Sequence, residues 1–210
     1  MTGGVPAMDY DANVFINCPF DEEYRPLFEA VVFAVMISGF TPRCALEAHD
    51  AGQGRLDMIM RIIAECKYGI HDISRTELNE EGLPRFNMPL ELGLDFGCRK
   101  YGPAKFRAKK LLVLDESEHR YQQFISDISG QDIKAHGREP RQIIRAVRDW
   151  LRTESKVSQI PGGDYMYARY QLYRESLPKI REALKLDLTT LPFLDLANTM
   201  LIWLQENETG

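Results

Sequence analysis

The chain has 210 residues, of which 44% are hydrophobic and 27% are charged, as is typical of a folded globular protein with one substantial domain and an appendage. Its net charge of −5 excludes a strong basic field that could hold a long nucleic-acid backbone. Apolar runs stay well short of membrane-spanning length and the N-terminus lacks a signal-peptide pattern, so we expect a cytoplasmic protein without a membrane partner.

Cysteine and histidine usage indicates neither a disulfide framework nor a metal site. The four cysteines are spread over expected strands and helices without a C-x-x-C pair, which is typical of a reduced, intracellular protein. The four histidines show no metal-ligand spacing. We therefore expect no metal and no tightly bound cofactor.

Strand and helix patterns alternate along most of the chain. After a leader over residues 1–12, the expected elements are a strand over 14–16, a helix over 25–38, a strand over 40–45, a helix over 55–67 and a strand over 68–73. Next come a helix that holds Glu91, a strand over 110–114, a weaker helix over 121–128, a strand over 132–135 and a helix over 139–152. A linker over 154–163 leads to two further helices, over 164–184 and 191–205.

This alternation predicts an α/β domain over residues 13–153 with a parallel sheet covered by helices on both faces. Five such units most often wind in the order 2-1-3-4-5, which is the doubly wound, flavodoxin-like arrangement. Residues 164–210 form a helical extension with an aromatic stripe of Tyr165, Tyr167, Tyr170, Tyr173, Phe193 and Trp203. Such a stripe packs on the domain or on a second subunit, so we expect a homo-oligomer formed through the C-terminal helices.

Basic residues gather between Arg99 and Lys110 and include Lys105, Arg107 and Lys109. The cluster predicts a solvated loop before a strand. Contact with a phosphate group is the alternative.

The topology also predicts where a ligand would bind. In an open parallel sheet, ligands lie beyond the carboxyl ends of the strands, near the point where the strand order reverses, here between the first and third strands. The residues delivered there are Asn17, Pro19, Phe20, Asp21, Asp72, Ser74, Arg75, Asn87 and Glu91. The exit loop of the second strand could add Glu47, His49 or Asp50. We expect the carboxylates of Asp72 and Glu91 to converge at this edge.

Glu91 stands out because leucines flank it at a predicted helix start. Asn87 is a suitable N-cap, and Pro89 suits the opening positions of a helix. The partial positive charge of a helix start would keep Glu91 ionised, as a nucleophile or a cation stabiliser must be. The alternative is that a glutamate in the first turn is favourable capping and nothing more.

Other candidates also have alternatives. Asp72 could bind a ligand or form ordinary turn chemistry after a strand. His71 lies among apolar neighbours and is expected to be a satisfied core histidine rather than a catalytic base. Phe20 could stack on a ligand or plug the top of the core, and Arg75 could contact a phosphate or solvent.

Several kinds of site are excluded by missing motifs. The chain has no G-x-G-x-x-G after its first strand, no G-x-x-x-x-G-K-[ST] and no G-x-S-x-G. The turn after the first strand has neither the Ser/Thr-rich phosphate cradle of a flavin mononucleotide protein nor the acidic pair of a phospho-acceptor receiver. What remains is a carboxylate-led site.

Three segments, in order, resemble the nucleoside 2-deoxyribosyltransferases. Residues 15–20, Phe-Ile-Asn-Cys-Pro-Phe, resemble the strand and turn that open those enzymes. Residues 63–74 resemble the helix–strand unit that ends in a substrate-binding Asp, and residues 90–93, Leu-Glu-Leu-Gly, resemble the element whose Glu attacks the sugar. Related Toll/interleukin-receptor-like (TIR) domains that cleave NAD share the arrangement. The resemblance covers about residues 13–150.

The resemblance implies that Glu91 is the nucleophile or the stabiliser of an oxocarbenium ion. Asp72 would bind the ribose or base, Phe20 would stack on the base and Asn87 would position the sugar. The implied activity is cleavage of the N-glycosidic bond of a nucleotide or nucleoside, with hydrolysis of NAD slightly preferred over base exchange. Such domains often serve as effectors in bacterial antiviral or toxin systems.

The chain departs from both families. Met88 and Pro89 follow Asn87 where the transferases have a small Gly-Thr-type pair, and the Trp-Cys-x-x-Glu-type motif of TIR domains is missing. The chain is therefore expected to be a divergent relative. The alternative function, from another class, is a non-catalytic module that binds a nucleotide signal or associates with itself.

Overall fold

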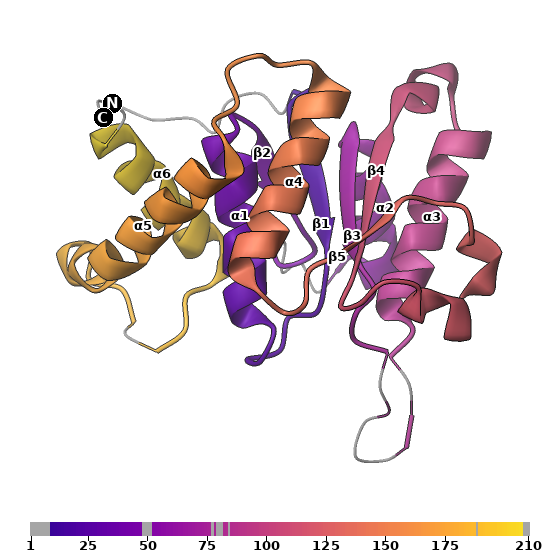
Figure 1. The fold of residues 1–210 in the computed structure, drawn as a ribbon, viewed down its shortest axis with the longest axis horizontal. Coiled ribbons are helices and arrows are strands. Elements are labelled where there is room, and N and C mark those ends of the chain that lie inside the picture. The colour runs from indigo at the N-terminus through magenta and orange to yellow at the C-terminus, as the bar shows by residue number, and fades with distance from the viewer. Residues whose placement is uncertain are drawn as a thin grey trace. The chain divides into compact units, whose positions relative to one another are not determined.

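The computed structural model describes residues 9–47, 52–76, 78, 82–83, 85–187 and 189–207 (Figure 1). These residues belong to two compact units. The first comprises Met1–Pro19 and Phe40–Gly137, and the second comprises Phe20–Gly39 and Arg138–Gly210. The first unit holds the sheet, and the second is helical. Residues 1–8 of the predicted leader lie outside the described residues.

Five parallel strands form the sheet of the first unit, in the order β2-β1-β3-β4-β5. They are β1 (Asn13–Asn17), β2 (Thr41–Arg43), β3 (Tyr68–Asp72), β4 (Lys110–Asp115) and β5 (Ile133–Ala135). The register pairs Asn17 with His71 and Asp72 with Leu114, so the carboxyl ends of β1, β3 and β4 meet at one edge. The α/β, flavodoxin-like fold class and the strand order are confirmed.

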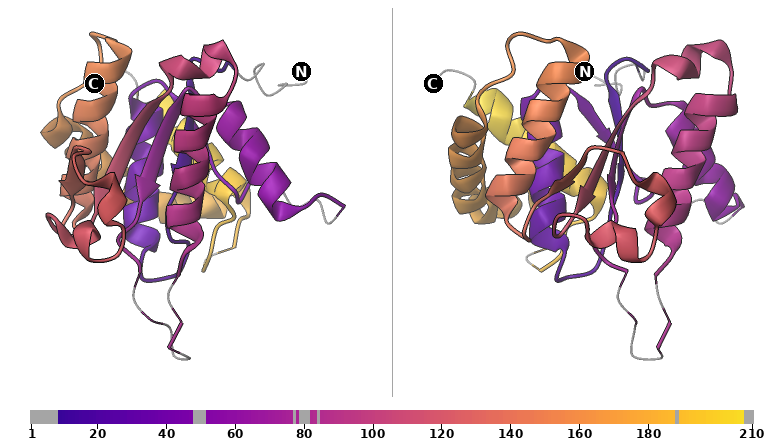
Figure 2. Two further views of the ribbon diagram at one scale, coloured as in Figure 1. Left: turned by 90° about the vertical axis from the view of Figure 1, so that its right-hand side faces the viewer. Right: turned by 45° about the vertical axis from the view of Figure 1, so that its right-hand side comes forward.

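Two helices pack on one face of this sheet, where Figures 1 and 2 show them beside the strands. They are α2 (Arg55–Ala64) and α3 (Asn87–Tyr101). Phe15 of β1 lies in a buried cluster with Ile62 of α2, against which Leu94 of α3 packs. Ile73, just after β3, packs with Leu92 of α3 in a second cluster. Apolar residues at helical spacing thus fix the face of α3 that meets the sheet.

The start of α3 differs from the prediction. Asn87 is the first helical residue and not the N-cap, which is Phe86 and makes no side-chain capping bond. The helix can begin two residues before Pro89 because the N–H groups of a first turn have no acceptor within the helix, so proline is tolerated there. Glu91 consequently lies just beyond the first turn.

The predicted helix over residues 121–128 is wrong. The chain forms two short 3-10 segments there, η2 (Arg120–Gln123) and η3 (Ser126–Ile128), after a left-handed His119 with φ of 61°. So short a segment without a sustained apolar stripe cannot recover the cost of nucleating an α-helix. A further 3-10 segment, η1 (Ala104–Ala108), lies in the region predicted as a loop.

The described residues of the second unit form four helices: α1 (Arg25–Ile37), α4 (Pro140–Ser155), α5 (Gly163–Leu184) and α6 (Phe193–Glu206). The ring of Phe33 in α1 lies 5.4 Å from Tyr170, 5.6 Å from Tyr173 and 6.0 Å from Trp203. Tyr170, Tyr173 and Trp203 of the aromatic stripe therefore pack within the chain, whereas Tyr165 is exposed, and oligomer formation stays a prediction. No helix of the described residues has both the length and the apolar character to cross a bilayer.

Candidate functional site

Glu91 lies on α3 near the carboxyl end of β2. Its carboxylate is within electrostatic range of Cys44, the residue directly after β2, and of Arg55, the first residue of α2. Burial raises the pKa of Glu91 to about 7, while the charge of Arg55 opposes the rise. Among the described residues the carboxylate has no hydrogen-bond or ion-pair partner.

This pKa corrects the expectation that the helix start keeps Glu91 firmly ionised. A carboxylate near a helix N-terminus gains about 0.3–1 kcal/mol at an exposed position, and the gain falls off beyond the first turn. Withdrawal from water acts in the opposite direction and is the larger effect for Glu91. At neutral pH the group is therefore divided between its acid and its carboxylate.

Asn17 ties the start of α3 to the sheet. Its Nδ2 donates to the carbonyl oxygen of Met88 at 2.9 Å and lies 3.0 Å from Nδ1 of His71. Both amide hydrogens are thereby engaged, and the residue is buried. Asn17, a predicted ligand-binding residue, thus holds the turn that precedes Glu91.

A buried polar chain continues from His71 beneath α3. Its Nε2 lies 3.1 Å from Oδ2 of Asp95, and Oδ1 of the same carboxylate lies 3.2 Å from Nζ of Lys109. Lys109 also donates to the carbonyl oxygens of Ile63, at 2.8 Å, and Cys66. These three side chains are at most 1% exposed. The prediction of a satisfied core histidine is confirmed. Asp95 was missed, and the prediction that Lys109 belongs to a solvated loop is wrong, because its ammonium group is buried against Asp95.

The absence of a side chain at Gly69 makes space for the side chains of His71 and Asp95. A Cβ atom at Gly69 would lie 2.5 Å from Oδ2 of Asp95 and 2.9 Å from Nε2 of His71. Because such contacts are too close for any side chain, a glycine in the middle of β3 is required by the ion pair above it. This unusual strand residue is the signal by which the sequence could have revealed a close approach.

Asp72, the other predicted carboxylate, belongs to a different environment. His71 and Ile73 contact α3, and since alternate strand residues point to opposite faces, Asp72 lies on the other face of the sheet. Its Oδ1 accepts the N–H of Ser74 at 2.8 Å, and its Oδ2 lies 3.0 Å from Nε2 of His136. The structure does not bring Asp72 and Glu91 together, and substrate binding by Asp72 stays a prediction.

Arg120 links the residues that follow β3 to the end of β4, and the sequence did not reveal this role. Its guanidinium donates to Asp115 at 2.8 Å and to the carbonyl oxygens of Ile73 and Ser74 at 3.0 and 2.7 Å. Burial raises the pKa of Asp115, and the bond from Arg120 counteracts this. Asp115 ends an apolar strand just as Asp72 does, and that parallel was the available signal.

The residues that follow β1 divide between the two units. Pro19 ends the first segment of the sheet unit and is buried. Phe20 belongs to the helical unit, where its ring meets Phe28 edge-on at 5.3 Å. Asp21 accepts the N–H of Tyr24 at 3.0 Å, as a capping residue before α1 would. Within their own unit both residues have structural roles, and ligand contact by them stays a prediction.

Three remaining candidates are described. Asn87 is exposed at the first position of α3, and Arg75 is partly exposed after β3. Glu47 forms an ion pair with Arg43, whose Nε donates to it at 2.7 Å. Two other candidates lie outside the described residues: His49 and Asp50.

Within the described ranges, no three His, Cys, Asp or Glu side chains gather so as to hold a metal ion. Comparison with protein-family models gives no match, and comparisons with curated proteins and with solved structures give none either.

Proposed function

We propose that the chain cleaves the N-glycosidic bond of a nucleotide, with Glu91 as its catalytic carboxylate. The observation that carries the proposal is the pKa of about 7, which burial gives to a group without a pairing partner among the described residues. Strongly perturbed acids concentrate at functional sites because an uncompensated buried charge lowers stability. The resemblance of residues 90–93 to the Glu-Leu-Gly element of nucleoside 2-deoxyribosyltransferases supports the same residue.

The chemistry suits a desolvated carboxylate. When the glycosidic C–N bond breaks, its electron pair leaves with the base and positive charge develops on the anomeric carbon. A carboxylate in a low-dielectric setting stabilises this charge more strongly than one in water. An oxygen of Glu91 can then form an ester with that carbon, and water hydrolyses the ester, which restores the carboxylate and releases a proton.

The position of Asp72 favours a particular class of substrate. Asp72 is held by His136 and Ser74 on the opposite face of the sheet from α3, so it is poorly placed to protonate a base that leaves beside Glu91. A base that already carries a positive charge, such as the nicotinamide of NAD, leaves as a neutral molecule and needs no acid. Its charge would also favour the ionised form of Glu91. NAD or a related dinucleotide is thus the preferred substrate, ahead of base exchange on neutral purines.

The test is incubation of the purified chain with NAD and, separately, with deoxynucleosides. We expect release of nicotinamide, and a loss of about 10³-fold or more in kcat for Glu91→Gln. Because the ionised form is required, kcat/KM should rise with pH and level off above about 7. Asp57→Asn removes an exposed carboxylate from the first turn of α2 and should leave activity unchanged.

Absence of product from every substrate, with NAD bound equally by the wild type and Glu91→Gln, would instead support the non-catalytic, nucleotide-binding or self-associating module. Light scattering with and without NAD measures self-association directly. A role as a cytoplasmic effector of bacterial defence follows from the resemblance alone and is proposed on that basis.

A further inference from the structure

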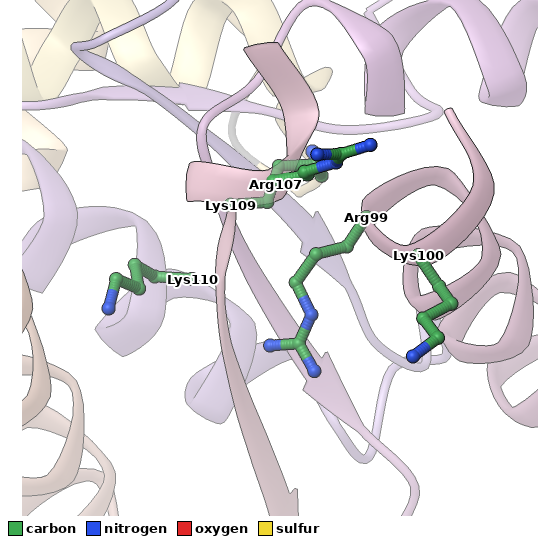
Figure 3. Close-up of a pocket in the computed structure, with 5 residues that line it drawn as sticks. All are labelled: Arg99, Lys100, Arg107, Lys109 and Lys110. Carbon is green, nitrogen blue, oxygen red and sulfur yellow. The ribbon is translucent and has the colours of Figure 1, made fainter. Parts of the chain in front are cut away.

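A basic hollow lies at the end of the sheet opposite the edge near Glu91. Its volume is about 500 Å³, and it is lined by Arg99, Lys100, Arg107, Lys109 and Lys110 (Figure 3). Lys110 is the first residue of β4, so this basic hollow belongs to the amino edge of the sheet. All its lining residues lie in the first compact unit.

The charges of the basic hollow are only partly neutralised. Lys109 is paired with Asp95, but no carboxylate of the described residues pairs with Arg99, Lys100 or Arg107. Figure 3 shows Arg99 and Lys100 extending in the same direction from the end of α3, while Arg107 and Lys110 extend in other directions. Lys100 and Arg107 are exposed and Arg99 is partly exposed, so all three can reach a ligand.

Ordinary helix electrostatics explains only part of this cluster. Arg99 and Lys100 occupy the last turn of α3, where cations interact favourably with the helix C-terminus. Arg107 lies on η1 and receives no such benefit from α3, yet it also lines the hollow. Like charges that line one hollow raise the electrostatic free energy, and a bound anion lowers it.

We propose that the basic hollow binds a small ligand carrying two or more phosphate groups. A volume of about 500 Å³ is within the range of small-molecule sites. Arginine guanidinium groups match phosphate oxygens with paired hydrogen bonds, and lysine adds a point charge. A long nucleic acid fits poorly, because the net charge is −5 and the hollow's cations are confined to the end of α3, η1 and the start of β4. This site goes beyond the proposed function and does not depend on it.

Calorimetric titration of the whole chain with inorganic tripolyphosphate tests the proposal. We expect saturable binding that weakens about tenfold or more in the double variant Lys100→Ser/Arg107→Ser, and that weakens further with added salt. Lys179→Ser removes an exposed cation from α5 and is the matched control, which should bind as the wild type does. Glu91→Gln should also bind normally, so failure here and failure of the proposed catalysis are distinguishable.

Circular dichroism establishes that the double variant is folded, as expected for two substitutions outside the core. No binding by the wild type, equal binding by the double variant, or equal weakening in Lys179→Ser would each overturn the proposal. Affinity for mixed-sequence single-stranded oligonucleotides that exceeds the affinity for tripolyphosphate and grows with length would overturn the ligand class. Tighter binding of tripolyphosphate than of the oligonucleotides supports a small ligand with several phosphate groups.

Discussion

Two carboxylates on α3, one helical turn apart, are withdrawn from water in different ways. Asp95 is fully buried, and each of its oxygens faces a cationic or polar partner, His71 at 3.1 Å and Lys109 at 3.2 Å. Glu91 is partly exposed, has no hydrogen-bond or ion-pair partner among the described residues and has a pKa raised to about 7. Residues at this spacing share one face of a helix, so Glu91 and Asp95 differ in their interaction partners and not in the side of α3 on which they lie.

The presence of partners at Asp95 and their absence at Glu91 indicate different roles for the two carboxylates. A buried charge with well-placed partners is roughly neutral for stability, but it becomes costly when one partner is removed. A carboxylate without partners lowers stability at neutral pH, so its retention calls for a use that the folded state alone does not supply. Asp95 is accordingly a structural residue that fixes α3 on the sheet, and Glu91 is the candidate for chemistry.

The largest expected effect comes from removing the partner of Asp95. Lys109→Met leaves the carboxylate with His71 alone, so the free energy of unfolding should fall by about 3–5 kcal/mol. Urea denaturation measures this change. Lys110→Met, one residue further on, replaces a side chain at the sheet edge and should cost less than about 1 kcal/mol. Equal losses in the two variants would show that Asp95 does not depend on the ammonium group.

Removing the charge of Glu91 should have the opposite sign. The folded pKa of about 7 lies above the ordinary value of 4.5, so ionisation opposes folding fully above pH 7. Glu91→Gln should then raise the free energy of unfolding by up to about 3 kcal/mol at pH 8. As the pH falls from 7 to 4.5 the wild type takes up the proton in its folded state, and the gain should vanish. A destabilised variant at pH 8 would contradict the idea that Glu91 is uncompensated.

The sequence predicted one side of this comparison and missed the other. Glu91 was visible because a charged residue between leucines at a helix start is unusual, and alternation of apolar runs placed that helix next to the sheet edge. The ion pair of Asp95 with Lys109 depends on the register of β3, α3 and β4 together. Gly69 signals a close approach to β3, but no local pattern identifies the two partners. The contact of Asp72 with His136 is hidden for the same reason, since the two residues follow different strands.

The basic residues show how an element boundary changes an interpretation. They were predicted to form a solvated loop, but α3 continues to Tyr101 and therefore includes Arg99 and Lys100. The segment after it turns back through η1, which brings Arg107 to the same hollow. Local propensity placed the strand at Lys110 correctly, yet only the packed structure shows that these residues line one hollow.

The smallest expected effect concerns Arg55, the charge that acts on Glu91 from α2. Arg55 lowers the pKa of Glu91 against the larger influence of burial, so Arg55→Gln should move that pKa upward. Carbon-13 NMR of the Glu91 carboxyl group measures the shift, and the rise of kcat/KM with pH should move in the same direction. Added salt should raise the wild-type pKa as well, because it screens an exposed cation such as Arg55, and should have less influence on the variant. Arg61→Gln, in the last turn of α2, is the matched control. If Arg61→Gln shifts the pKa of Glu91 as much as Arg55→Gln does, then Glu91 responds to the overall charge of α2 and not to Arg55 in particular.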